Sequence, residues 1–205
     1  MPIRIAILGG PRCGKTTLIQ QIYVDMKVRG LNVGAETEYS TEYLKEKGMI
    51  ETISEQYGIY LGQARLESNL NNFDYALTDY ATFVPYIYGR FMLGDKKRTQ
   101  KEIEILNDLY KIALNDVNKY DHIFYVPREF GYEKDGVRWQ DEDIAIAIDE
   151  AIRIFLDSEN IKYTVLTGST RARSESILKH VGLDKLEVIP TITDTMKSKN
   201  QTEAK

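Results

Sequence analysis

Short β-branched and aromatic runs alternate along the chain with longer amphipathic segments. The first apolar run, Ile3 to Leu8, ends at Gly9, and from Lys15 to Val28 apolar residues recur every three or four positions. A short apolar run bounded by glycine is typical of a buried strand, and the three-four spacing is typical of a helix packed on one face. The pattern therefore predicts a strand that is followed at once by a helix.

The same alternation continues to about residue 190. Further strands are predicted over 31–35, 73–79, 122–126 and 163–167, with a weaker last strand over 186–189. Further helices are predicted over 40–47, 54–70, 85–92, 101–119, 144–156 and 169–180. Strands that alternate with helices indicate βαβ units and a parallel sheet covered on both faces. We therefore expect an α/β fold with a parallel sheet of about five strands and helices on both faces, in which ligands bind at the carboxyl ends of the strands.

Composition and charge narrow the class of protein. The 205 residues are 42% hydrophobic and 28% charged, which is typical of a globular domain and excludes global disorder. The net charge of -4 gives no overall basic field, so a nucleic-acid partner is possible but is not favoured. No apolar run approaches the roughly 18 residues of a membrane span, and Cys13 is the only cysteine. We expect a cytoplasmic protein with no membrane partner, one domain over 1–190, and a disordered tail over 191–205.

The strongest chemical signal is a glycine-rich segment between the first predicted strand and helix. It matches the spacing G-x-x-x-x-G-K-[ST] of a phosphate-binding P-loop, so the expected α/β fold is a P-loop NTPase fold. Glycines let backbone N–H groups surround phosphate oxygens at the start of a helix. We expect Lys15 to contact the terminal phosphates of ATP and the Thr16 hydroxyl to contact Mg²⁺. The expected nucleotide-binding residues of this segment are Gly9, Gly10, Pro11, Arg12, Cys13, Gly14, Lys15, Thr16 and Thr17.

Three carboxylates follow the second and third predicted strands. A phosphate site needs carboxylates that hold the metal and orient the attacking group. We expect Asp79 to hold Mg²⁺ together with Thr16, because Asp79 lies next to the P-loop if its strand neighbours the first. Asp79 or Glu36 is expected to orient the acceptor as a catalytic residue, with Glu38 as an alternative. A helix cap or a solvated turn is the plain structural interpretation of each.

Arginines after the later strands are candidates for neutralising charge on the transferred phosphoryl group. Arg138 lies in a charged segment that we expect to form a lid over about 127–142. Arg128, at the end of the fourth predicted strand, is a second candidate. Arg173, after the fifth strand, is expected on the adenine side of the nucleotide. An exposed turn or the capped start of a helix is the alternative for these positions.

The order of these motifs resembles that of the NadR-type P-loop kinases, which are AAA-like proteins grouped with the ribosylnicotinamide kinase domain. The resemblance covers about residues 3–180 and is most specific in the P-loop. It implies a small parallel-sheet kinase that uses ATP and Mg²⁺. It also implies that Lys15 and Thr16 contact the phosphates and metal, that Asp79 lies near the metal, and that Arg138 belongs to a lid.

The motifs and the resemblance together favour one function. We expect a kinase that transfers the γ-phosphoryl group of ATP to a nucleoside- or nucleotide-like small molecule. One alternative is a kinase that acts on a hydroxymethylated base in DNA. The other is a nucleotide-dependent ATPase switch, in which hydrolysis moves the lid.

Overall fold

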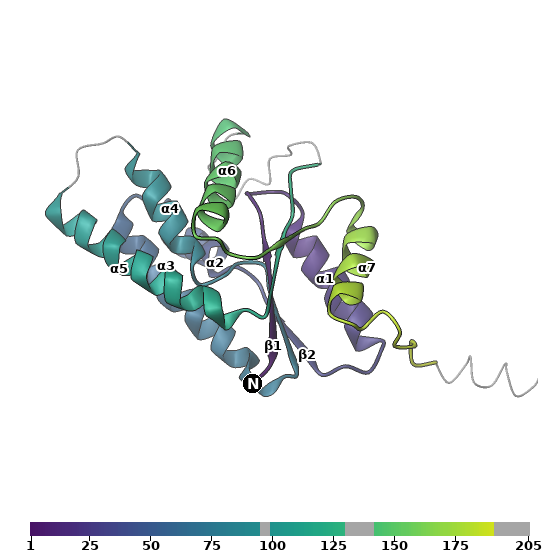
Figure 1. Ribbon diagram of the computed structural model, residues 1–205. Coiled ribbons are helices and arrows are strands. Elements are labelled where there is room, and N and C mark those ends of the chain that lie inside the picture. The colour runs from purple at the N-terminus through teal and green to yellow at the C-terminus, as the bar shows by residue number, and fades with distance from the viewer. Residues whose placement is uncertain (95–98, 130–141, 191–205) are drawn as a thin grey trace, which may run out of the picture.

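A five-stranded parallel sheet forms the centre of the molecule (Figure 1). The computed structural model describes residues 1–94, 99–129 and 142–190. The strand order is β2-β3-β1-β4-β5, and every pairing is parallel. The strands are β1 (Ile3–Leu8), β2 (Val33–Glu36), β3 (Tyr75–Thr78), β4 (His122–Tyr125) and β5 (Thr164–Val165). The predicted fold class and number of strands are confirmed.

Helices cover both faces of the sheet, and the side chains of the central strand β1 are therefore buried on both faces. Ile5 and Ile7 pack on one side, while Ala6 and Leu8 pack on the other. This explains the continuous apolar run, since successive strand side chains point to opposite faces. The first side carries α1 (Lys15–Lys27) and α7 (Thr170–His180). The second carries α3 (Ile53–Ser68), α4 (Val84–Leu93), α5 (Gln100–Asp116) and α6 (Glu142–Ser158).

Short elements complete the described part of the chain. The 3₁₀ turns η1 (Asn69–Asn72) and η2 (Val117–Lys119) follow α3 and α5. Helix α2 (Tyr39–Lys47) packs on α3, and none of its nine residues is buried. Gly62 of α3 makes this packing possible, because a Cβ there would overlap the Tyr39 ring. None of the described helices combines the length and apolarity that crossing a membrane requires.

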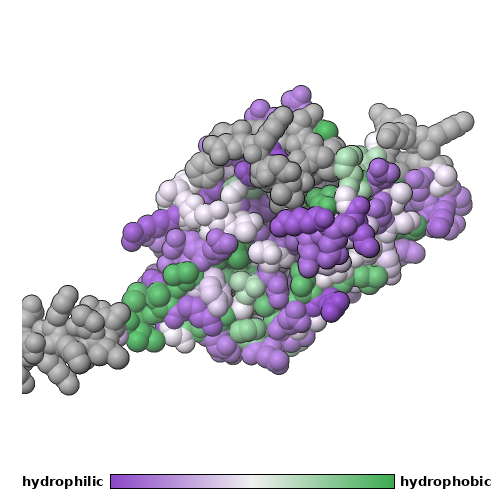
Figure 2. Space-filling model, turned by 180° about the vertical axis from the view of Figure 1, so that it is seen from behind, coloured by the Kyte–Doolittle hydropathy of each residue, from purple (hydrophilic) through white to green (hydrophobic). Residues whose placement is uncertain are grey.

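The prediction of a weak strand over 186–189 is wrong, because the structure describes these residues and has no strand there. Helix α7 packs on α1, and the segment that follows α7 runs beside the carboxyl end of α1. There the Ile189 N–H donates to the Val28 carbonyl oxygen at 2.8 Å. Val188 and Ile189 are more than half exposed, and apolar side chains gather on the face seen in Figure 2. The predicted tail over 191–205 lies outside the described residues.

The register of the central strands positions the candidate site. Ala6 of β1 and Glu36 of β2 both align with Thr78, the last residue of β3. Strand β1 continues to Leu8, two residues beyond the end of β3, and the P-loop begins directly after it. The residues that follow β1, β2 and β3 therefore meet at one edge of the sheet.

Candidate active site

The glycine-rich segment turns from the end of β1 into α1 through an unusual backbone. Gly9, Arg12 and Gly14 have positive φ angles of 149°, 63° and 86°. A Cβ on Gly9 would lie 2.5 Å from the carbonyl oxygen of Val126, so only glycine fits there. Backbone that alternates between right- and left-handed residues forms a concave nest for anions. The left-handed φ angles of Arg12 and Gly14 are of the kind found in such nests.

Lys15 brings a positive charge to the start of α1. Its Nζ donates to the Gly10 carbonyl oxygen at 2.9 Å and lies 3.9 Å from Cys13 Sγ. Among the described residues, no side chain caps this helix, and its first turn contains no acidic residue. The partial positive charge of the helix start therefore adds to that of Lys15. Thr16 and Thr17 are exposed on the same first turn.

Thr16 and Asp79 meet at the edge between β1 and β3. The Thr16 hydroxyl donates to Asp79 Oδ2 at 2.6 Å, and Asp79 is 1% exposed. Hydroxyl and carboxylate oxygens are hard donors that suit Mg²⁺, which usually takes its other ligands from phosphates and water. The pair therefore fits a phosphate-bound Mg²⁺. In the described ranges no cluster of three or more histidine, cysteine, aspartate or glutamate residues could hold a metal by itself.

The two glutamates after β2 lie in different surroundings. Glu38 is 9% exposed and lines a small cavity together with Lys15 and Asp79. Glu36 lines an open groove of about 620 Å³ along the outer edge of β2, and it accepts a 3.4 Å hydrogen bond from Asn69. The strand ends at Glu36, and the turn into α2 carries Glu38 toward the P-loop. The structure thus brings Glu38 to Lys15 and Asp79, and it does not bring Glu36 there.

Arg173 holds the P-loop from the side of β4. Its guanidinium is 1% exposed, pairs with Glu129 at 2.9 Å and donates to the Cys13 carbonyl oxygen at 3.4 Å. The Gly168 N–H donates to Glu129 at 2.7 Å, and this bond, with the Arg173 charge, lowers the pKa of Glu129. Arg173 therefore contacts the loop backbone from within the protein.

Arg128 also binds the loop backbone. Its guanidinium donates to the Pro11 carbonyl oxygen at 2.7 Å. The two arginines after β4 and β5 thus fix the P-loop backbone from one side. Arg138 and residues 130–141 of the predicted lid lie outside the described residues.

Asp149 of α6 is a site residue that the sequence analysis missed. Its Oδ1 accepts a 2.5 Å hydrogen bond from the Gly10 N–H, and a Cβ on Gly10 would contact its side chain. Burial and the neighbouring Asp149 carboxylate raise the pKa of Tyr125. Asp149 lies between Ala145 and Ile152 on the apolar face of α6, and this placement is the signal that could have identified it.

Gln63 of α3 ties together the two segments that carry the carboxylates, and it was also missed. Its Oε1 accepts from the Tyr39 N–H at 2.9 Å, next to Glu38. Its Nε2 donates to the Tyr80 carbonyl oxygen at 2.9 Å and to Thr78 Oγ1 at 3.2 Å, on either side of Asp79. Gln63 is fully buried, so it fixes the spacing between these segments.

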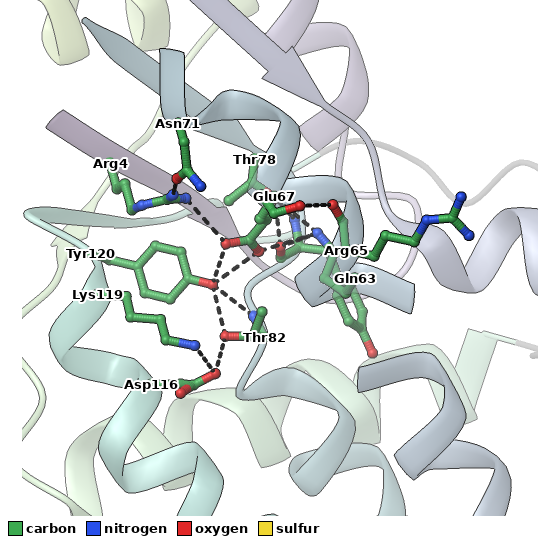
Figure 3. Close-up of polar contacts among 12 residues, drawn as sticks. Arg4, Gln63, Arg65, Glu67, Asn71, Thr78, Thr82, Asp116, Lys119 and Tyr120 are labelled. Atoms are coloured by element: carbon green, nitrogen blue, oxygen red, sulfur yellow. Dashed lines mark hydrogen bonds and ion pairs between the residues drawn. The ribbon is translucent and has the colours of Figure 1, made fainter. Parts of the chain in front are cut away.

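A buried polar network continues from Gln63 away from the P-loop (Figure 3). Glu67 accepts hydrogen bonds from Gln63 Nε2 at 3.2 Å and from the Tyr120 hydroxyl at 3.0 Å. Tyr120 accepts from the Thr82 N–H at 2.7 Å, and Arg4 lies 3.7 Å from Glu67. Burial outweighs these contacts and raises the pKa of Glu67 to about 7.

Comparisons with known proteins agree with this architecture. The model of a family described as "AAA domain" matches residues 4–173. A crystal structure of NadR protein in complex with NR has a TM-score of 0.70 and 19% identity, and covers 93% of this chain and 54% of that chain. A crystal structure of NadR protein in complex with NAD and AMP-PNP has a TM-score of 0.69 and 17% identity, and the match covers 93% of this chain and 52% of that chain. The structure of thymidylate kinase from Candida albicans has a TM-score of 0.64 and 14% identity, and the match covers 93% of this chain and 96% of that chain. None of the curated proteins compared with the chain matches it.

These comparisons confirm the fold and the resemblance to NadR-type proteins. The chain spans about half the length of the two NadR chains and nearly the whole length of the thymidylate kinase. At identities below 20% the likeness concerns the fold alone. Function has to be argued from the site residues themselves.

Proposed function

The chain belongs to the AAA domain family, and on this premise we propose that it is an ATP-dependent kinase of small molecules. It transfers the γ-phosphoryl group of ATP to a hydroxyl or phosphate of a nucleoside- or nucleotide-like acceptor. The observation that carries the proposal is the convergence of Lys15, Thr16 and Asp79 at the start of α1. The likeness to NadR protein, whose structure is a complex with NAD and AMP-PNP, and the likeness to a thymidylate kinase support it.

The P-loop residues bind the nucleotide phosphates in this proposal. The loop N–H groups and the start of α1 face the phosphate oxygens, and Lys15 neutralises charge on the terminal phosphates. Thr16 and Asp79 hold Mg²⁺, which when bound supplies Lewis-acid stabilisation of phosphate charge. Asp149, Arg128 and Arg173 bond to the loop and keep its backbone in the binding conformation.

Glu38 is the carboxylate best placed to orient the acceptor. It lines the same cavity as Lys15 and Asp79, whereas Glu36 lines the outer groove. Asp79 accepts the hydroxyl of Thr16 at the start of α1, which suits the metal role. Glu38 accepts the hydroxyl of Thr41 and lines the cavity, which suits the acceptor role. Glu38 accepts the proton of the attacking hydroxyl as the new oxygen–phosphorus bond forms and ADP leaves. Positioning and electrostatics account for most of the rate enhancement.

ATP turnover across a panel of acceptors tests the proposal. The panel comprises nucleosides, nucleoside monophosphates, nicotinamide riboside and DNA that contains hydroxymethyluracil, with ADP and phosphorylated product both measured. We expect ADP formation that depends on a small-molecule acceptor. Formation that depends on the DNA would move the function to base modification. Formation indifferent to every acceptor would identify an ATPase switch and overturn the kinase proposal.

Substitution of Lys15 tests the phosphate site directly. Lys15→Ala should lower turnover at least about 100-fold while the fold is retained. Lys111→Ala is the matched control, because Lys111 is an exposed lysine on α5 with a 76% exposed side chain. Full turnover in Lys15→Ala would show that the P-loop does not bind the reacting phosphates.

A further inference from the structure

An apolar pocket continues from the cavity that contains Lys15 and Asp79. It lies between α2, α3, α4 and α6, and its wall includes Ile59 and Phe91. Glu38, Tyr80 and Tyr88 line both the pocket and the cavity, so the two are adjacent and share a wall. A molecule in the pocket can therefore present a reacting group to Glu38 beside the P-loop.

Gln56 gives this pocket a polar group on the side away from Lys15. Its side chain is 1% exposed and lines the pocket but not the cavity. Its Nε2 donates to Met92 Sδ at 3.3 Å, and sulfur is a weak acceptor. Its buried Oε1 finds no hydrogen-bond donor among the described residues. Buried carbonyl oxygens are nearly always paired in proteins, so Oε1 of this pocket residue is an acceptor that a bound molecule can use.

We propose that this pocket takes the planar nitrogen heterocycle of the acceptor and that Gln56 determines which acceptor is used. A ring N–H or amino group of the heterocycle donates to Gln56 Oε1. The amide also carries a donor, so it pairs with a heterocycle edge on which a donor and an acceptor are adjacent. The inference rests on the proposed kinase function and narrows its substrate class to nucleosides and their close analogues.

Helix α2 is the cover of this pocket. The pocket encloses only about 30 Å³ of free volume, so a heterocycle enters when part of the wall moves outward. Ser40 and Leu44 of α2 form that part of the wall, and no residue of α2 is buried. Moving α2 therefore exposes little apolar surface compared with moving α3 or α4. Gln63 holds the Tyr39 N–H at the start of α2, so Glu38 keeps its place while the part of α2 that carries Leu44 moves.

Replacing Gln56 by leucine removes the amide and keeps a similar volume. For the nucleoside that the wild type phosphorylates, Gln56→Leu should raise the acceptor KM about tenfold or more. The KM for ATP should stay unchanged, and the thermal midpoint should not fall, because an unpaired buried group is removed. Gln20→Leu is the matched control, since Gln20 lines the groove at the edge of β2.

The outcomes separate the pocket from the proposed function. An unchanged acceptor KM in Gln56→Leu, or a raised KM in Gln20→Leu instead, would overturn the inference. If no acceptor is phosphorylated, the kinase proposal fails, and calorimetry with the same nucleosides and nicotinamide riboside still tests the pocket. Binding that is lost in Gln56→Leu and retained in Gln20→Leu supports it. Absence of binding by the wild type would refute it.

Discussion

The hydroxyl of Thr16 donates a 2.6 Å hydrogen bond to Asp79, although 63 residues separate the two in the chain. They meet because β3 pairs with β1 in parallel, so the residue after β3 lies under the first turn of α1. A hydroxyl and a carboxylate at this distance are the protein ligands that a phosphate-bound Mg²⁺ would use.

Asp79→Asn tests this metal site, since it keeps the size of the side chain and removes its charge. We expect turnover to fall about 100-fold or more, with a higher Mg²⁺ concentration needed for half-maximal rate. Turnover measured over a Mg²⁺ titration checks this. Asp108→Asn, at an exposed site on α5, is the control. An unchanged Mg²⁺ dependence in Asp79→Asn would exclude Asp79 as a ligand.

The glutamates after β2 can be distinguished by a paired substitution. Glu38→Gln should lower kcat about 100-fold, because the base for the acceptor hydroxyl is lost. The KM for ATP should change little. Glu36→Gln should leave kcat within about a factor of three, since Glu36 lines the outer groove. Steady-state kinetics of both variants decide the assignment, and the opposite order would return the acceptor role to Glu36.

Asp79 and Glu38 show how far the sequence could lead. Asp79 could be anticipated because it directly follows a strand, and neighbouring strands in a parallel sheet bring such residues to one edge. The choice between Glu36 and Glu38 depends on how the chain turns between β2 and α2. That turn is set by contacts of Tyr39 with Gln63 and Gly62, which are remote in sequence.

Gln63 and Asp149 show why supporting residues are harder to find. Both lie on the packed faces of their helices, where position along the helix predicts at most burial. Their partners, Tyr39 and Gly10, are determined by how α3 and α6 pack against the edge of the sheet. A polar residue within an apolar stripe is the sequence signal, but it does not identify the partner.

Arg173 is expected to act as a positioning residue for the P-loop. Arg173→Lys keeps the charge but cannot bond to Glu129 and the Cys13 carbonyl oxygen at once. We expect the free energy of unfolding to fall by about 2 kcal/mol and the KM for ATP to rise, with a smaller change in kcat. Urea unfolding and ATP kinetics measure these effects.

Arg171→Lys is the matched control for Arg173. Arg171 lies two residues earlier, pairs with Glu175 on the surface, and has an 85% exposed side chain. An exposed pair contributes little to stability, so this variant should match the wild type. If the two variants behaved alike, Arg173 would have no special role at the loop.

Glu67 gives the protein a stability that depends on pH. Burial raises its pKa from an ordinary value of 4.5 to about 7, so the folded state binds this proton more tightly than the unfolded chain. The stabilisation is complete below about pH 4.5 and is lost as the pH rises through 7. A shift of this size corresponds to roughly 2 to 3 kcal/mol between pH 5 and pH 8.

Glu67→Gln isolates this contribution, because glutamine stays neutral at every pH and has nearly the same shape. At pH 5 its free energy of unfolding should be equal to or lower than that of the wild type. The difference, variant minus wild type, should be more positive at pH 8 than at pH 5. Urea unfolding of both proteins at several pH values gives the difference, in which all other titrating groups cancel. Since Tyr120 and Gln63 donate to Glu67, some loss of hydrogen bonding shifts the whole curve by a constant. A difference that does not vary between pH 5 and pH 8 would show that Glu67 has the same pKa in the folded and unfolded states.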